Sequence, residues 1–380
     1  MAVDASVKGF DTLVSVLCFV LFGLFCFAYL YCYQADLMTF TQYVLAHGQT
    51  HYNHLVGALL ITVLLSCLSI CVLRLFKHIS FLPALAFFPS SVLLASVSGL
   101  HRQAFGCYTF GSWPIWLVVL LMLFIGIVSW MKSARIADLI FVRRMSLAQS
   151  SLANASVLLA LFAFVCLSSN GNRVLHTQLH VEQCILDGDV DGAMSALDQS
   201  NDRDSSLTML SAYVLSMKGS LGEHLFERPL LGGSASLLPD GKTVGFAMIP
   251  ESTLFDYVGI WTLQRMSPTR YLEFLQRRHK GKKAAADYLL CAYLLDKKLD
   301  RFVAALPKYY KVNDSLPKHY REALLLYMHL HTSPAIIYKN NVMEADFQDY
   351  QKLSSETPDK RERETKLRDT YGNTYWFYYQ

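Results

Sequence analysis

Charged residues are scarce in this chain, and they are scarcest in its first part. Lys, Arg, Asp and Glu make up 17% of the 380 residues, whereas hydrophobic residues make up 53%. A soluble domain has about 25% charged residues, so the composition excludes a wholly soluble protein. Residues 1–170 hold eight basic and four acidic side chains, and residues 171–380 hold 26 of each. The net charge of +4 therefore indicates membrane orientation and gives no support to a nucleic-acid partner.

The chain also lacks the short motifs of common catalytic and metal sites. It has no CxxC pair, which leaves zinc and redox motifs without support. The pair Gly232-Gly233 lacks the Gly-Lys-Ser/Thr ending of a phosphate-binding loop. No Ser/His/Asp or Cys/His arrangement stands out from scattered residues. We therefore predict no catalytic residue, no cofactor and no metal ion, and a protein that is not an enzyme.

Cysteine usage gives little further information. Six of the nine cysteines lie in apolar segments, where a thiol behaves as a small hydrophobic group. The other three, Cys107, Cys184 and Cys291, lie outside those segments and leave a disulfide open. No two of them are close in sequence, so the spacing does not choose a pair.

Long apolar segments are what the first part of the chain does contain. They cover residues 12–35, 55–73, 79–100, 113–131 and 152–167. A hydrocarbon core of about 30 Å needs about 20 helical residues, so the last segment is short and the others are long enough. We predict an all-α protein with a transmembrane domain of about five helices, residues 1–170, followed by an extramembrane helical domain, residues 171–380.

The basic residues of the first part predict its orientation. With five spans, seven Lys and Arg lie on the side of the amino terminus and only Arg102 lies on the other side. Because positive residues favour the cytoplasmic side, we place the amino terminus in the cytoplasm and residues 171–380 across the membrane. If the fifth segment did not cross, residues 171–380 would be cytoplasmic. The basic stretch Lys132–Ser150 is expected to lie along the interface as an amphipathic helix.

The third apolar segment has features of a helix inside a bundle. Pro83 and Pro89 predict kinks, which neighbouring helices and hydroxyl groups make tolerable. Ser91, Ala95 and Gly99 fall four residues apart on one helix face. Small residues at this spacing allow another helix to approach closely, so we interpret this face as a packing surface.

Residues 171–380 show the pattern of paired amphipathic helices. Three apolar stripes have the i, i+3, i+4, i+7 spacing of a helix that packs on a core. They are Val190, Ala193, Met194 and Leu197; Leu299, Phe302, Val303 and Leu306; and Tyr320, Ala323, Leu324 and Tyr327. Two of them follow a helix across a tight polar turn, at 187–189 and 296–298, which is typical of tetratricopeptide-like hairpins. We predict short helical hairpins packed as a curved array.

Between the hairpins, glycines and prolines at 229–250 break the helical pattern. Lys242–Met248 is expected to be a strand or an extended loop. Phe255–Met266 and Tyr271–His279 are expected to be two further helices. The basic run Arg277–Lys283 is expected to be a solvated face, with a contact to a partner or an anionic surface as the alternative.

Five consecutive aromatic residues, Tyr375–Tyr379, close the sequence. A cluster of this size is not expected to remain in water. We predict that it docks against the helical domain as a final strand or helix. Insertion at the bilayer interface and capture by a partner remain as alternatives.

Two polar features follow the first apolar segment. His47, His51 and His54 have metal-ligand spacing if they share one helix, but no carboxylate or cysteine completes the set nearby. We therefore expect interfacial polar packing for them. Asp36 lies immediately after the segment, where membrane glycosyltransferases that use polyprenyl-linked donors place an acidic residue. The chain resembles those enzymes only at this position, with fewer spans and no paired acid.

The layout of amino-terminal spans and an outer helical domain, with LPKHYREALLLY at 316–327 and TYWFYY at 374–379, resembles an uncharacterised family of Bacteroidetes inner-membrane proteins. The resemblance implies a bacterial inner membrane and a periplasmic, tetratricopeptide-like carboxy-terminal domain. It supplies no activity, cofactor or catalytic residue.

From these features we expect an inner-membrane protein that contacts the lipid bilayer and whose periplasmic domain binds a protein partner or acts as a scaffold. Two alternatives belong to other classes. One is a glycosyltransferase-like enzyme with Asp36 as its acid, and the other is a structural subunit of a membrane complex without binding specificity of its own.

Overall fold

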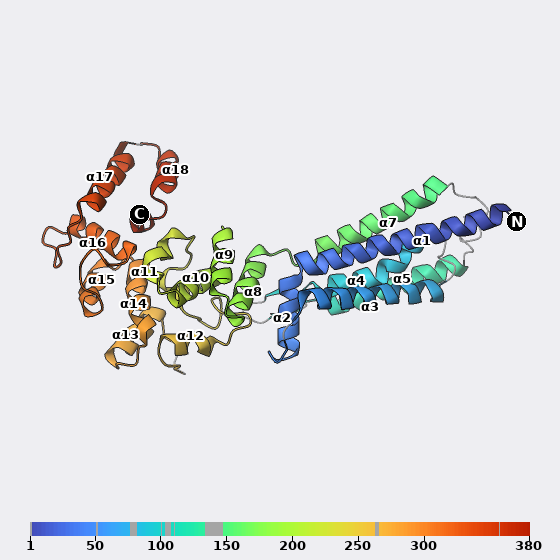
Figure 1. Cartoon of the computed structure of the whole chain (residues 1–380), viewed down its shortest axis with the longest axis horizontal. Helices are drawn as coiled ribbons and strands as arrows, with labels where there is room; N and C mark the ends of the chain where they lie inside the picture. The colour runs from blue at the N-terminus through green and yellow to red at the C-terminus, as the bar shows by residue number, and fades with distance from the viewer. Residues whose placement is uncertain are drawn as a thin grey trace. The chain divides into compact units, whose positions relative to one another are not determined.

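The computed structural model describes residues 2–50, 52–76, 82–99, 101–102, 108–109, 111–133, 147–262, 266–356 and 358–380. The fold is all-helical, as predicted, apart from one pair of two-residue antiparallel strands. The chain divides into two compact units, one within residues 1–172 and the other Arg173–Gln380. Figure 1 shows the helices of both units.

The first unit is a bundle of apolar helices. Its α-helices are α1 (Ala2–Ala28), α2 (Ala35–Leu45), α3 (His54–Leu75), α4 (Phe88–Val97), α5 (Trp113–Ser133) and α7 (Leu147–Ser168). A π-helical turn, η1 (Tyr29–Tyr33), follows α1, and a 3-10 helix, η3 (Pro83–Phe87), precedes α4. The strands are β1 (His101–Arg102) and β2 (Tyr108–Thr109).

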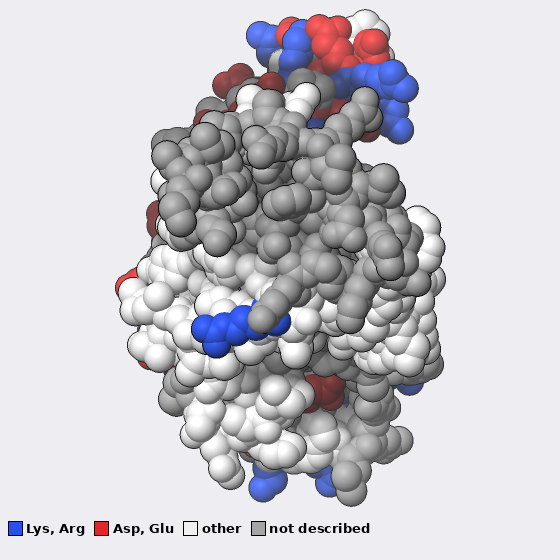
Figure 2. Space-filling model, turned by 90° about the vertical axis from the view of Figure 1, so that its right-hand side faces the viewer, with Lys and Arg blue, Asp and Glu red and all other residues white. Residues whose placement is uncertain are grey.

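Four helical stretches among the described residues are long and apolar enough to cross a membrane. They are Leu13–Tyr33, His54–Leu75, Trp113–Met131 and Ala148–Ser168. At most a third of the most apolar part of each is buried within the unit, so their outer faces are apolar. Figure 2 shows one face of the molecule, on which most of the described atoms belong to uncharged residues, with a basic patch near the middle and a patch of both signs at the top edge. Apolar outer faces of this length are typical of helices in contact with lipid.

The third predicted segment, 79–100, is not one long helix. Its described part is a 15-residue helical stretch, Pro83–Val97, made of η3 followed by α4. With about 2.0 Å rise per residue in the 3-10 part and 1.5 Å in the α part, it is about 25 Å long, slightly less than a hydrocarbon core. Pro83 and Pro89 each stand at the start of a helix, where no amide hydrogen is needed. A full crossing by this segment stays a prediction.

The helices of the bundle alternate in direction along the chain. The Tyr29 hydroxyl donates to Ser98 Oγ (2.8 Å), and the Asn170 amide donates to the Ser98 carbonyl (3.0 Å). The ends of α1, α4 and α7 therefore meet at one end of the bundle. Gly99 lies against the indole of Trp113, so α5 begins at that same end. Five antiparallel segments in sequence place the start of α1 and the end of α7 at opposite ends of this unit (Figure 1).

Polar side chains fix α4 at the centre of the bundle. Ser69 and Ser90 are fully buried, with their hydroxyl oxygens 2.9 Å apart and the Leu65 carbonyl within 3.0 Å of both, so one hydroxyl donates to that carbonyl while the other donates to its partner or to the same carbonyl. The buried Asn154 of α7 accepts the backbone amide of Ala84 (3.0 Å), which η3 leaves free. Interhelical hydrogen bonds of this kind hold helices together where no hydrophobic force distinguishes protein from lipid.

The predicted packing face on the third segment is confirmed. Ser91, Ala95 and Gly99 are buried, and a side chain on Gly99 would overlap Trp113. The predicted interfacial helix at Lys132–Ser150 lies largely outside the described residues, although its last residues, from Leu147 onward, begin α7.

The second unit contains only helices and connecting loops among its described residues. Its α-helices are α8 (Arg173–Leu186), α9 (Val190–Gln199), α10 (Ser205–Met217), α11 (Leu221–His224), α12 (Glu251–Val258), α13 (Pro268–Arg277), α14 (Lys283–Leu295), α15 (Leu299–Ala305), α16 (Lys318–Leu330), α17 (Asn341–Glu356), α18 (Lys360–Tyr371) and α19 (Tyr375–Tyr379). Three 3-10 turns join them: η5 (Leu225–Glu227), η6 (Gly233–Leu237) and η7 (Leu306–Lys308).

Three helices form the core of this unit. Nearly all residues of α10, and the stretches Tyr288–Leu295 of α14 and Tyr320–Tyr327 of α16, are buried. A helix that is apolar on every side must be surrounded by others. The predicted hairpins surround them: α9 packs on α8 and α10, and α15 packs on α14 and α16. Most residues of the three predicted stripes are buried, which confirms these helix faces.

Two further helices differ from the predicted bounds. The helix expected at Phe255–Met266 runs from Glu251 to Val258, and the one expected at Tyr271–His279 runs from Pro268 to Arg277. Gly259 follows the first helix in a non-helical conformation, and Pro268 occupies the first turn of the second, where proline is favoured.

The loop at 243–249 is held by a glutamate that the sequence gave no reason to single out. Lys242–Met248 is an irregular loop and not a strand, because the amides of Ala247, Met248 and Ile249 donate to the Glu182 carboxylate at 2.6–3.2 Å. Glu182 is fully buried in α8. Burial raises the pKa of Glu182, while the amide hydrogen bonds oppose that shift.

The aromatic terminus docks on the core as the short helix α19, as predicted. Tyr375 and Trp376 are buried, and the Tyr375 amide donates to Glu322 Oε2 (2.7 Å). The Trp376 indole donates to the Glu322 carbonyl (2.9 Å). Glu322 is itself buried and lies 2.9 Å from Nδ1 of the buried His319. Docking therefore combines apolar burial with hydrogen bonds that satisfy a buried carboxylate.

Replacing Trp376 by alanine tests this docking. Removal of a buried tryptophan side chain costs about 3–5 kcal/mol, so we expect the amides of α16 to exchange about 100-fold faster or more in the full-length protein in detergent, measured by hydrogen exchange. Trp261→Ala is the control, since Trp261 is 45% exposed and should leave α16 protected. Unchanged protection of α16 in Trp376→Ala would contradict the docked structure.

Candidate binding groove

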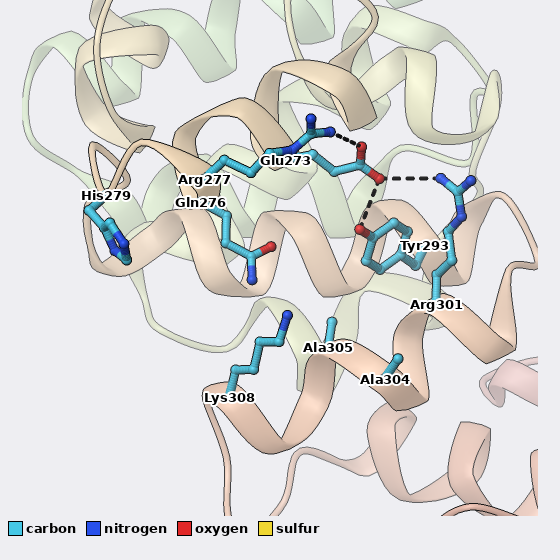
Figure 3. Close-up of a pocket in the computed structure, with 9 residues that line it drawn as sticks. All are labelled: Glu273, Gln276, Arg277, His279, Tyr293, Arg301, Ala304, Ala305 and Lys308. Carbon is cyan, nitrogen blue, oxygen red and sulfur yellow. Dashed lines mark hydrogen bonds and ion pairs between the residues drawn. The ribbon is translucent and has the colours of Figure 1, made fainter.

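A concave, polar surface forms where α13, α14 and α15 meet. In α13, Tyr271, Leu272 and Leu275 are buried, which turns Glu273 and Arg277 to the opposite side. In α15 and η7, buried Phe302 and Val303 likewise leave Arg301 and Lys308 outward. The polar face of α13 and the polar face of α15 and η7 therefore border the same depression (Figure 3).

Two adjoining pockets make up this depression, which we call the basic groove. One has a volume of ≈ 660 Å³ and is lined by Glu273, Gln276, Arg277, His279, Tyr293, Arg301, Ala304, Ala305 and Lys308. The other has a volume of ≈ 680 Å³ and is lined by Leu272, Leu275, Gln276, His279, Gly281, Lys282, Lys283, Ala285, Ala286, Asp287, Lys308, Tyr309 and Tyr310. Gln276, His279 and Lys308 belong to both, so the two pockets form one elongated groove.

Glu273 organises the first pocket. Its carboxylate accepts hydrogen bonds from Tyr293 (3.0 Å), Arg277 (3.3 Å) and Arg301 (3.2 Å), as Figure 3 shows. Burial, and then the Glu273 carboxylate, raise the pKa of the Tyr293 hydroxyl, which therefore stays protonated and donates. Both arginines are largely exposed, so they keep donors directed to solvent.

The second pocket holds the other acidic residue of the groove. Asp287 Oδ1 accepts the hydroxyl groups of Tyr310 (2.7 Å) and Tyr320 (2.9 Å). Burial, together with this carboxylate, raises the pKa of Tyr310. Tyr320 is fully buried and lies 3.6 Å from the thiol of Cys291, so the floor of the pocket is tied to the core.

The electrostatic balance of the groove is positive. Five Lys and Arg line the two pockets against two acidic residues. Both carboxylates are engaged by groove residues, whereas Lys282, Lys283 and Lys308 form no ion pair with any residue that the structure describes. Lys282 and Lys283 also stand at the start of α14, which has no side-chain cap and no acid in its first turn. The positive end of the helix dipole adds to their field.

The predicted basic run is a solvated face that also borders the basic groove. Arg277–Lys283 is exposed, as expected, but it borders both pockets. Sequence reasoning did not connect this run with Arg301 and Lys308. The sequence signal that could have connected them is the polar helix face opposite the apolar stripe that begins at Leu299.

The helix that a histidine metal site would require is not continuous from His47 to His54. His47 lies beyond the end of α2 at a positive φ of 49°, next to Gly48 at 73°, and α3 begins only at His54. Because left-handed residues end a helix, His47 and His54 do not share one helix face. His54 Nε2 lies 3.1 Å from Thr39 Oγ1, and His51 lies outside the described residues. Over the described ranges, no group of three His, Cys, Asp or Glu could hold a metal ion.

Asp36 lies in the first turn of α2 and is partly exposed. An acid at this position suits the positive end of a helix dipole. No pocket described above includes it.

The comparisons with known proteins concern the region of the groove. Residues 262–380 match the model of a family of unknown function (DUF6057). The matched residues contain α13–α19, and with them the basic groove, the stretch at 316–327 and the docked terminus at 374–379. No curated protein and no solved structure matches the chain.

Cys184 and Cys291 are free thiols in different surroundings, and Cys107 lies outside the described residues. Cys291 is fully buried, and burial raises the pKa of its thiol. Cys184 is partly exposed, with Sγ 3.9 Å from His180 Nε2.

We expect a water-soluble maleimide to label Cys184 and to spare Cys291 in the folded full-length protein, because the thiolate is the reactive form. Peptide mass mapping measures both sites, and labelling after denaturation is the control in which both react. Protection of Cys184 that only a reductant removes would instead show a disulfide.

Proposed function

We propose that this chain is an integral membrane protein whose carboxy-terminal helical unit binds a protein partner in the basic groove. The observation that carries the proposal is the groove itself, two adjoining pockets with cationic and apolar lining on a rigid helical support. Concave surfaces of several hundred Å³ with few, well-placed polar groups are the common form of binding sites. The consecutive helix pairs around the groove are consistent with a tetratricopeptide-like scaffold.

We also propose that the protein lies in a bacterial inner membrane, with a cytoplasmic amino terminus and a periplasmic second unit. The bias of basic residues supports this orientation. The alternating helix directions support an odd number of crossings, since the end of α7 lies at the opposite end of the bundle from the start of α1.

Fusions to alkaline phosphatase test this topology, because the enzyme is active only where disulfides form. A fusion after Asn172 should be active, and a fusion after Ser133, at the end of α5, should be inactive. The amounts of both fusions are compared by immunoblot. An active fusion after Ser133, or an inactive one after Asn172, would contradict the five-segment topology.

Site-specific crosslinking in cells tests the proposed binding. A photoreactive amino acid at Gln276, which lines both pockets, should form a discrete adduct with another protein. Lys308→Glu should abolish this adduct, whereas Lys339→Glu, an equal charge change at an exposed lysine outside the groove, should leave it. An adduct insensitive to Lys308→Glu, or none at Gln276, would contradict binding in the groove.

Of the alternatives, the structural subunit is favoured by one observation, the apolar outer faces of the bundle helices. It predicts adducts from the outer face of α5 and none from Gln276. A transferase that uses Asp36 has no comparable support among the pockets described here.

A further inference from the structure

We propose that the basic groove binds an acidic peptide segment of a partner protein. In the unliganded groove, the Glu273 carboxylate occupies the position that a carboxylate of this peptide takes on binding. The proposal rests on the function proposed above and specifies the chemistry of the partner. It is derived from the charge balance, the shape and the internal contacts of the groove.

The charge balance selects an anionic ligand. The two acidic residues of the groove are already hydrogen-bonded by groove side chains, so neither offers a free anion to a cationic ligand. Lys282, Lys283 and Lys308 have no ion pair with a described residue. Charges in a concave site focus their field, which attracts ligands of opposite sign.

The shape favours an extended peptide over a membrane surface. Two pockets in a row, which share Gln276 and Lys308, provide successive side-chain positions along one line. Ala304 of the first pocket is exposed and Ala285 of the second is partly exposed, so apolar residues of a peptide would be covered as well. The Gln276 amide carries both donors and an acceptor, which suits a peptide backbone. A flat lipid surface would reach the rim and leave the floor of this groove unoccupied.

The contacts of Glu273 show how a carboxylate is held there. Tyr293, Arg277 and Arg301 converge on it from three helices, and the arrangement is that of a carboxylate receptor filled by the chain's own residue (Figure 3). Arginine donors suit carboxylates because their planar fork matches the two oxygens. A ligand carboxylate would share or take over the two exposed arginines, and Glu273 would compete with it.

Binding of defined peptides to the full-length protein in zwitterionic nanodiscs tests this inference. The probe is a fluorescent peptide of alternating Glu and Leu, with alternating Gln and Leu, and Lys and Leu, as matched controls. We expect anisotropy to show binding of the acidic peptide alone, weakened by salt. Lys308→Glu should weaken binding at least tenfold, and Lys339→Glu should not.

The Glu273→Gln substitution distinguishes competition between Glu273 and the ligand from a purely structural role of Glu273. Removing the competing charge frees both arginines, so the acidic peptide should bind about three to ten times more tightly, while the neutral peptide should still not bind. Weaker or equal binding in Glu273→Gln would overturn the role of Glu273. Equal binding of acidic and neutral peptides would overturn recognition of carboxylates.

Two further outcomes separate the inference from the proposed function. If inorganic phosphate or vesicles with anionic lipid bind in a Lys308-dependent way and the acidic peptide does not, the peptide proposal is wrong. If no acidic peptide binds but the crosslink at Gln276 persists and depends on Lys308, the partner is of another chemistry and the proposed function stands. Loss of both would remove the proposed function as well.

Discussion

Two buried glutamates, Glu182 and Glu322, hold distant segments of the second unit together. A carboxylate without partners is costly to bury, so each must be met by donors that are already in place. Glu182 meets three successive backbone amides of the loop 247–249, and Glu322 meets the amide of Tyr375. Both contacts tie a segment with little regular structure to a helix far away in sequence. The hydroxyl groups of Tyr375 and Tyr378 then donate to the carbonyls of Leu294 and Leu295, which fixes the end of α14. The groove is built around this helix.

Local patterns in the sequence predicted the helices but not these contacts. Apolar spacing identifies which side of α9, α15 and α16 packs, because the spacing of a helix face is a local property. The backbone amides that donate to Glu182 and Glu322 lie more than fifty residues away, and nothing near either residue in the sequence distinguishes it from an exposed acid. A metal site built from the histidines, which the sequence did not favour, would need a helix through Gly48, where the chain adopts the left-handed conformation that ends helices.

In the first unit, too, the composition predicted the helices but not the details of their conformation. Apolarity and length identified four helices that are long and apolar enough to cross a membrane, since such a helix needs little else in its sequence. Apolarity did not reveal that the third segment begins as a 3-10 helix at Pro83, continues as an α-helix from Phe88 and is shorter than its apolar run. It also did not reveal that serines pair across α3 and α4, because a hydroxyl on an apolar helix can bond its own turn or a neighbour equally well.

The groove illustrates why a charged run has no fixed meaning in a sequence. Arg277–Lys283 would be an ordinary solvated turn if the facing helix carried acids, since exposed ion pairs contribute little and leave no net field. Here the facing elements supply Arg301 and Lys308 instead, and the nearby carboxylates of Glu273 and Asp287 are engaged by other groove side chains. A protein that gathers like charges in a concavity loses some stability through their repulsion. An anionic ligand removes that repulsion on binding, so the same charges that weaken the free protein favour the complex.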